Sequence, residues 1–142
     1  MPQSTGKWRD AMIAVDTNVL VRLLTGDQPQ QAAAARALFA AVEPIWIAKT
    51  VLLETGWVLR SLYRFEESAI HDALRKLLGL NNVRVEDAPS VAAALALLPH
   101  GIELADAMHL TGRPAGTSFV SFDKAFVECA RLAGLIDVSG VR

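Results

Sequence analysis

The sequence has a single cysteine, Cys129, and no apolar run long enough for a membrane-spanning helix. One cysteine cannot close a disulfide within the chain and cannot by itself hold a structural zinc ion. The start, MPQSTGKWRD, is polar and lacks the apolar core of a secretory signal. These absences predict a protein of the reducing cytoplasm with no membrane partner.

Charge is also scarce: 20% of the 142 residues are charged, the net charge is -1, and 52% are hydrophobic. This composition predicts a folded chain with a well-buried core and excludes a disordered one. A near-neutral balance argues against a protein that holds nucleic acid by overall positive charge. The composition does not exclude a nuclease. If metal neutralised four carboxylates, the rest of the chain would carry an excess of about three positive charges.

Short apolar runs alternate with Ala-rich or amphipathic segments along the chain. Residues 1–11 show no periodicity and predict a mobile N-terminal arm, with Met12 as an alternative first residue, and residues 12–142 are expected to form one domain. The expected strands are 12–15, 45–48, 83–85, 117–121 and 136–138. The expected helices are 30–42, 51–63 with Thr50 as its cap, 65–80, 89–98, 103–110 and 124–132. Strands that alternate with helices predict an α/β fold with a mainly parallel sheet covered on both faces.

Asp16 is the first polar residue after the apolar run 12–15. Such a run predicts a buried strand of a parallel sheet, and Asp16 then lies at its carboxyl end, the edge where open α/β sheets bind ligands. An ionised carboxylate at such a place needs a hydrogen bond, a cation or a metal. The structural alternative is an Asp that caps the turn after the strand.

Three further acids occur in apolar surroundings. Glu54 lies in the apolar segment 51–63, whose Trp57 is expected in the core, and the other two are Asp106, in a short helix, and Asp123, after a strand. Each has a structural alternative: a surface pair with Lys49 for Glu54, and helix capping for the two aspartates.

A parallel sheet brings strand ends and neighbouring helix starts to one edge, so we expect the four carboxylates to meet there. Carboxylates in one cleft repel one another, and some would be protonated unless a cation were present. Mg²⁺ and Mn²⁺ take oxygen ligands, and such a site can activate water, orient a phosphate and stabilise the leaving oxygen. The pattern therefore predicts a divalent-metal site that cleaves a phosphodiester.

Four segments in order, IAVDTNVLVRLL, VLLETGWVL, ELADAMHL and SFDKAF, resemble the PIN-domain ribonucleases, and the VapC toxins of bacterial toxin–antitoxin pairs most of all. The resemblance covers about residues 12–138. It implies a PIN-like α/β/α fold and metal-dependent cleavage of RNA, with Asp16, Glu54, Asp106 and Asp123 as the acidic quartet. It also implies that the three aspartates bind Mg²⁺ or Mn²⁺ directly, and that the glutamate reaches the metal through water or orients the nucleophile.

Other residues have supporting roles in this hypothesis. Thr17 and Asn18 match the family's polar pair after the first Asp and would hold the carboxylates in place. His109 shares a helix face with Asp106 and is a candidate for bonding a carboxylate or phosphate, with a satisfied, partly buried histidine as its alternative. Basic residues that are candidates for phosphate contacts, and otherwise ordinary solvated side chains, are Arg22, Lys49, Arg60, Arg64, Arg113 and Lys124.

The partners follow from the resemblance. A toxic nuclease acts on RNA, such as tRNA or ribosomal RNA, and requires an antitoxin protein that covers its cleft. The excess of apolar residues also suggests a homodimer.

Two other classes of function are open at this point. A haloacid-dehalogenase-type phosphatase or a receiver domain also uses an Asp at a strand end, but the former needs a second Asp at position 18, where this chain has Asn18. The receiver's paired acids and later Lys–Pro are not evident. A catalytically inactive PIN domain that only binds partners is the remaining alternative, and the presence of all four acids argues against it.

Overall fold

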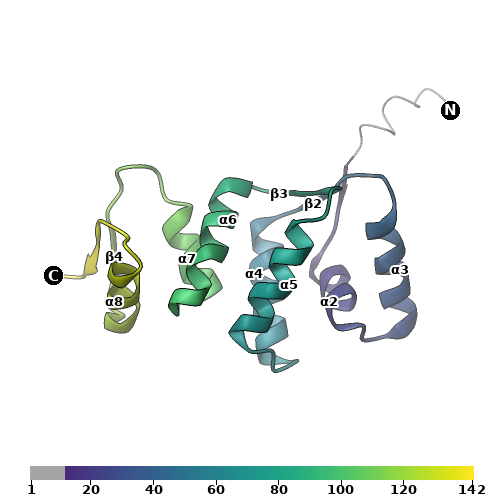
Figure 1. Cartoon of the computed structure of the whole chain (residues 1–142), viewed down its shortest axis with the longest axis horizontal. Helices are drawn as coiled ribbons and strands as arrows, with labels where there is room; N and C mark the ends of the chain where they lie inside the picture. Colours follow the sequence, from purple (N-terminus) through teal and green to yellow (C-terminus); the bar gives the residue numbers. More distant parts are fainter. Residues whose placement is uncertain (1–11) are drawn as a thin grey trace. The chain divides into compact units, whose positions relative to one another are not determined.

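The structure is a computed structural model that describes residues 12–142 (Figure 1). The chain divides into two compact units, the first ending at Glu86 and the second spanning Asp87–Arg142, and each is described by itself. The expected arm, residues 1–11, lies outside the described residues. The expectation of one domain over residues 12–142 stays a prediction.

The first unit contains a three-stranded parallel sheet in the order β1-β2-β3. Its elements are β1 (Ile13–Ala14), α2 (Thr17–Thr25), α3 (Pro29–Ala40), β2 (Ile45–Ile47), α4 (Lys49–Ser61), α5 (Glu67–Leu78) and β3 (Val83–Val85). Ile45 of the central strand pairs with Ile13 on one side and Val83 on the other. Strand and helix alternate as the sequence predicts, and the prediction of an α/β fold with parallel strands is confirmed.

The strand before Asp16 is not buried, and that part of the prediction is wrong. Ile13 is 36% exposed because β1 is at the edge of its sheet and has one neighbour, whereas Ile45 and Ile47 of β2 are fully buried between two strands. An apolar run shows that a segment favours a strand but does not show its place in the sheet.

A helical hairpin follows β1, and its first helix, α2, is not among the helices expected from the sequence. The hairpin turns at Gly26, whose φ of 73° is left-handed and whose N–H donates to the carbonyl oxygen of Arg22. Pro29 opens α3, as its fixed φ favours. Figure 1 shows α2 between α3 and α4, so its buried residues, Leu20 and Val21, belong to the core of this unit.

Helix α4 corrects two expectations. It begins at Lys49, so Thr50 lies inside the first turn, and the capping position is taken by Ala48, which has no side-chain hydrogen bond. Trp57 is 56% exposed and is not part of the core, because the buried face of the helix is formed by Leu52, Thr55, Gly56 and Leu59.

A hydrogen-bond network fixes the hairpin to the end of α4. The Arg22 guanidinium donates from Nε to Gln31 Oε1 (2.8 Å) and from Nη1 to the Tyr63 hydroxyl (3.3 Å). The Tyr63 hydroxyl in turn donates to Asp27 Oδ2 at 2.7 Å. These bonds join α2, the turn after it, α3 and the loop after α4.

The Tyr63 hydroxyl lowers the pKa of the Asp27 carboxyl below its usual 3.8, with smaller help from the Gln28 N–H and the charge of Arg22. A depressed folded-state pKa stabilises the fold above the unfolded pKa, and this stabilisation is lost as pH falls through the folded value. We therefore expect Tyr63→Phe to lower the melting temperature at pH 7, with a difference from wild type that shrinks below about pH 3.8. In an Asp27→Asn background the pH-dependent part of this difference should vanish, and its persistence there would contradict the assignment.

The second unit contains a parallel pair of strands packed with helices. Its elements are α6 (Ala88–Leu97), the short 3-10 helix η1 (Leu98–His100), α7 (Leu104–Thr111), β4 (Phe119–Ser121), α8 (Lys124–Leu132) and β5 (Val138–Gly140). Phe126 of α8 is buried and meets Phe119 of β4 edge to face, with ring centroids 5.7 Å apart. None of the helices between residues 12 and 142 is long and apolar enough to span a membrane.

The last strand begins two residues later than the sequence predicts. The Arg113 guanidinium donates to the carbonyl oxygens of Ile136 (3.0 Å) and Asp137 (3.2 Å), and Asp137 adopts a left-handed φ of 58°. Pairing with β4 therefore runs from Val138 to Gly140.

Candidate active site

Asp16 lies two residues after the end of β1 and is the N-cap residue of α2. Its backbone is extended, and its Oδ1 accepts the Val19 N–H at 3.4 Å, a long bond that occupies one carboxylate oxygen weakly. The side chain is exposed. The structure thus places Asp16 at the carboxyl end of a parallel strand and also gives it the capping role weighed above.

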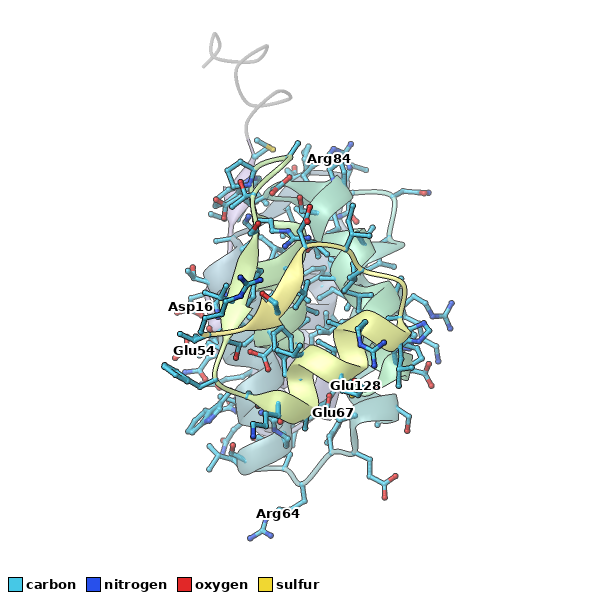
Figure 2. The ribbon with its side chains drawn as sticks, turned by 90° about the vertical axis from the view of Figure 1, so that its left-hand side faces the viewer. Asp16, Glu54, Arg64, Glu67, Arg84 and Glu128 are labelled. Atoms are coloured by element: carbon cyan, nitrogen blue, oxygen red, sulfur yellow. The ribbon has the colours of Figure 1, made fainter. Side chains whose placement is uncertain are left out.

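Glu54 projects from the second turn of α4 and is bound by the residue next to Asp16. The Thr17 hydroxyl donates to Glu54 Oε1 at 2.5 Å, a short charge-assisted bond. Thr17 is itself buried, which gives the bond a fixed donor. Asp16 and Glu54 are both labelled in Figure 2, and the bond from Thr17, the residue that follows Asp16, links the segments that carry this pair of predicted acids within the first unit.

The second unit holds the other pair in one pocket. This pocket has a volume of about 190 Å³ and is lined by Gly101, Ile102, Glu103, Asp106, Asp123, Ala125, Phe126 and Cys129. Asp106 comes from the first turn of α7, and Asp123 comes from the residue before α8. Two acids that are 17 positions apart in the sequence therefore open into the same cavity.

Glu103 is a third acid of this pocket, and the sequence reasoning missed it. It is the N-cap residue of α7 and precedes Asp106 by three positions. That spacing, one helical turn, was a usable signal, because residues at i and i+3 share a helix face.

The surroundings of the Asp106 carboxyl raise its pKa and so disfavour its charged form. Burial raises its pKa above the usual 3.8, and the negative charges of Glu103 and Asp123 raise it further, while the charge of His109 partly offsets them. A carboxylate that loses water and faces like charges is stabilised by a cation. The acidic side chains that line this pocket offer carboxylate oxygens, the ligand type that Mg²⁺ and Mn²⁺ prefer.

Asp123 has a structural role as well as a place in the pocket. Its side chain accepts the Phe126 N–H at 3.0 Å and caps α8, and its own N–H donates to Ser121 Oγ at 3.0 Å. The capping alternative from the sequence is thus correct for Asp123, and it is compatible with a second role because the carboxylate has a second oxygen.

Within residues 12–142, no three His, Cys, Asp or Glu side chains form a group that would hold a metal ion. The structure assembles the four predicted acids as two pairs, each in its own unit. The quartet as the ligands of one metal site stays a prediction.

Residues 13–132 match the sequence model of the PIN domain family, a span that includes both acidic pairs. The chain belongs to the PIN domain family. Members of this family are typically metal-dependent nucleases. No curated protein sequence matches the chain significantly.

The PIN assignment leaves no support for the phosphatase and receiver alternatives. His109 of α7 is exposed, and its charge lowers the pKa of Asp106. This interaction is expected for two residues that lie three positions apart on one helix face.

Six basic residues are predicted to contact phosphate, and the structure shows named side-chain bonds for three of them. Arg22 belongs to the hairpin network, Arg60 binds Glu67 Oε1 at 2.8 Å, and Arg113 binds two carbonyl oxygens. Lys49 opens α4, where its N–H donates to Glu86 Oε1 at 2.9 Å, and Lys124 opens α8 directly after Asp123. Arg64 is exposed just after α4 and has a left-handed φ of 60°. Their contacts with RNA stay a prediction.

Proposed function

We propose that this PIN domain is a Mg²⁺- or Mn²⁺-dependent endoribonuclease and the toxin of a type II toxin–antitoxin pair. The observation that carries the nuclease proposal is the Asp106 carboxyl, half-buried beside Glu103 and Asp123 in a pocket that offers oxygen donors to a cation. The family supports the same chemistry. The toxin role rests on the resemblance of the four sequence segments to VapC proteins.

In this proposal Asp16, Asp106 and Asp123 hold the metal. A bound divalent ion lowers the pKa of a water molecule and balances the charge that develops on the phosphate. Glu54, fixed by the Thr17 hydroxyl, orients the attacking water, and His109 and Asn18 hold the carboxylates and the phosphate in position. Attack of this water on phosphorus would break the bond to the 3′ oxygen, and the proton lost by the water would be balanced by one gained by that oxygen, which would leave a 5′-phosphate and a 3′-hydroxyl.

The proposed partners are an RNA such as tRNA or ribosomal RNA, an antitoxin, and a second copy of the chain. Large apolar side chains are exposed in each unit, including Trp57 and Leu62 in the first and Phe122 and Leu132 in the second. An excess of exposed apolar side chains is typical of surfaces that bind other proteins. A small upstream reading frame that encodes a DNA-binding N-terminus would support the antitoxin pairing.

Metal removal tests the nuclease proposal. We expect the purified chain to cleave RNA with Mg²⁺ or Mn²⁺ and to lose this activity when a chelator is added, with recovery when metal is restored. Cleavage that continues in chelator would exclude the mechanism. An absence of cleavage under all metal conditions, with intact RNA binding, would favour the inactive PIN alternative.

A matched pair of glutamine variants excludes a contaminating nuclease in this experiment. Glu54→Gln keeps an oxygen that accepts the Thr17 hydroxyl but removes the charge, so cleavage should fall while the fold is retained. Glu43→Gln changes an exposed glutamate in the same unit and should leave cleavage unchanged. Equal cleavage by the two variants would show that the activity does not belong to this site.

A further inference from the structure

A cavity of about 410 Å³ lies between α2 and α3 in the first unit. It is lined by Asn18, Val19 and Arg22 from α2 and by Gln31, Ala34, Ala35 and Leu38 from α3. We propose that this cavity binds one nucleotide of the RNA substrate and so selects the sequence that is cut. The proposal rests on the proposed function and assigns a substrate subsite to it.

The polar side of the cavity is a guanidinium held in place before any ligand arrives. Arg22 donates from Nε to Gln31 and from Nη1 to Tyr63, and Tyr63 is fixed by Asp27. Among the hydrogen bonds of the described residues, none uses the donors on Arg22 Nη2. A guanidinium of fixed orientation can donate hydrogen bonds to the oxygens of a phosphate or of a base. Because the side chain is already ordered, binding would cost little further conformational entropy.

The rest of the cavity lining is mostly apolar. Val19, Ala34, Ala35 and Leu38 offer a surface against which a flat base can lie, and the two alanines leave the room for it. The volume falls in the range of about 300 to 1,000 Å³ that is usual for small-molecule sites. Asn18 adds an amide with both donors and an acceptor, as the edge of a base or a ribose 2′-hydroxyl requires.

The cavity adjoins the first acidic pair. Val19 lines the cavity, and its N–H is the donor to the Asp16 carboxylate. Asn18 also lines it and follows Thr17, the residue that binds Glu54. A nucleotide in the cavity would therefore lie within one helical turn of Asp16, beside the bond to be cut.

Filling the cavity tests the proposal. Ala34→Phe places a ring in it from an exposed position of α3, and Ala37→Phe adds the same ring to the same helix outside the cavity. Both are made in the full chain with Asp106→Asn, which blocks cleavage, and the probe is a fluorescent single-stranded RNA oligonucleotide of mixed sequence, read by anisotropy with Mg²⁺. We expect Ala34→Phe to weaken binding about 10-fold, the loss that follows from removing about 1.4 kcal/mol of contacts with one nucleotide, and Ala37→Phe to leave it within about 2-fold.

A charge-matched pair gives a second measurement. Arg22→Gln should weaken binding by a similar factor, whereas Arg36→Gln, on the exposed side of α3, should not. Circular dichroism and melting temperature show whether each variant is folded. If Arg22→Gln unfolds because the network is lost, the Ala34 and Ala37 pair still decides the question.

Equal affinities of the Ala34→Phe and Ala37→Phe proteins would overturn the subsite, as would an absence of binding by the parent chain. If Ala34→Phe instead changes the oligomeric state or the binding of an antitoxin and leaves RNA affinity unchanged, the cavity is a protein contact and the proposal is wrong. Cleavage by the wild-type chain with equal affinities would reject the subsite but keep the nuclease. Weaker binding by Ala34→Phe without any cleavage by wild type would keep the subsite and reject the nuclease.

Discussion

Replacing Asp106 with Asn is expected to lower the rate of RNA cleavage by at least about 100-fold while the fold is retained. Loss of a group that only supports a metal ligand already costs about 10- to 100-fold in affinity or activity, so loss of a ligand should cost more. Asn keeps the size of the side chain but removes the charge that would hold the cation. Initial rates of cleavage with saturating Mg²⁺ give the measurement.

The same substitution lowers the cleavage rate but is not expected to lower the stability of the metal-free protein. The folded-state pKa of Asp106 is raised by burial and by Glu103 and Asp123, so the folded state binds more protons and its stability falls as pH rises through the window above 3.8. Asn has no such penalty, and at pH 7 without metal the variant should melt at the same or a higher temperature than wild type.

Mg²⁺ should change the melting temperatures of wild type and Asp106→Asn by different amounts. It should raise the melting temperature of wild type, because a ligand of the folded state stabilises it, and should have little effect on Asp106→Asn. Asp72→Asn, at an exposed position of the first unit, should respond to Mg²⁺ as wild type does. Full cleavage by Asp106→Asn, or an equal response of all three proteins to Mg²⁺, would reject the assignment of Asp106 as a ligand.

Two substitutions of Asp123 are expected to separate its role as a helix cap from its role at the metal. Asn caps a helix about as well as Asp, so Asp123→Asn should keep the bond to the Phe126 N–H and melt near wild type. Asp123→Ala should lose about 1 kcal/mol of unfolding free energy with the cap. Both should lose cleavage by about 100-fold or more, because neither keeps the carboxylate.

Denaturant unfolding and cleavage rates measured on the same preparations decide between the roles. Cleavage by Asp123→Asn at the wild-type rate would show that the carboxylate is a cap alone. Loss of cleavage by Asp123→Ala in proportion to its unfolded fraction would lead to the same conclusion. The expected result is that the stability of Asp123→Asn and of Asp123→Ala differs, whereas their cleavage rates do not.

The sequence predicts those parts of the fold that short-range chemistry determines. Helix α8 spans the expected residues and begins at Lys124 because Asp123 caps it, and α3 begins at Pro29, one residue before the expected start. The hydrophobic repeat of α5 likewise places Ile70, Leu74 and Leu77 in the core.

The failures arise where long-range packing decides. Trp57 is expected in the core because its helix is apolar, yet the helix turns this residue outward. The final strand is displaced by hydrogen bonds from Arg113, a residue more than 20 positions earlier. Neither the exposure of Trp57 nor the start of the last strand can be predicted from the residues nearby in the sequence.

The candidate site also has features that the sequence predicts and features that depend on packing. Residue type and spacing are enough to select Asp16, Glu54, Asp106 and Asp123 as candidates, but the short bond from Thr17 to Glu54 depends on the packing of α2 against α4. The cavity between α2 and α3 is also invisible in the sequence, because its volume depends on how closely two helices approach.

The internal partners of Arg60 and Arg113 have a consequence for how the chain would hold RNA. The Arg60 guanidinium is already paired with the Glu67 carboxylate, so it would displace few counterions from a nucleic acid. Arg113 keeps its positive charge, but its bonds to two backbone carbonyl oxygens leave fewer of its N–H groups for a phosphate. With a net charge of -1, the attraction of the chain to the polyanion would be weaker and less dependent on salt than that of a strongly basic protein. Discrimination among RNAs would then come from the shapes and hydrogen-bonding edges of particular nucleotides, and a tRNA or ribosomal loop that presents them would be recognised against a large excess of other RNA.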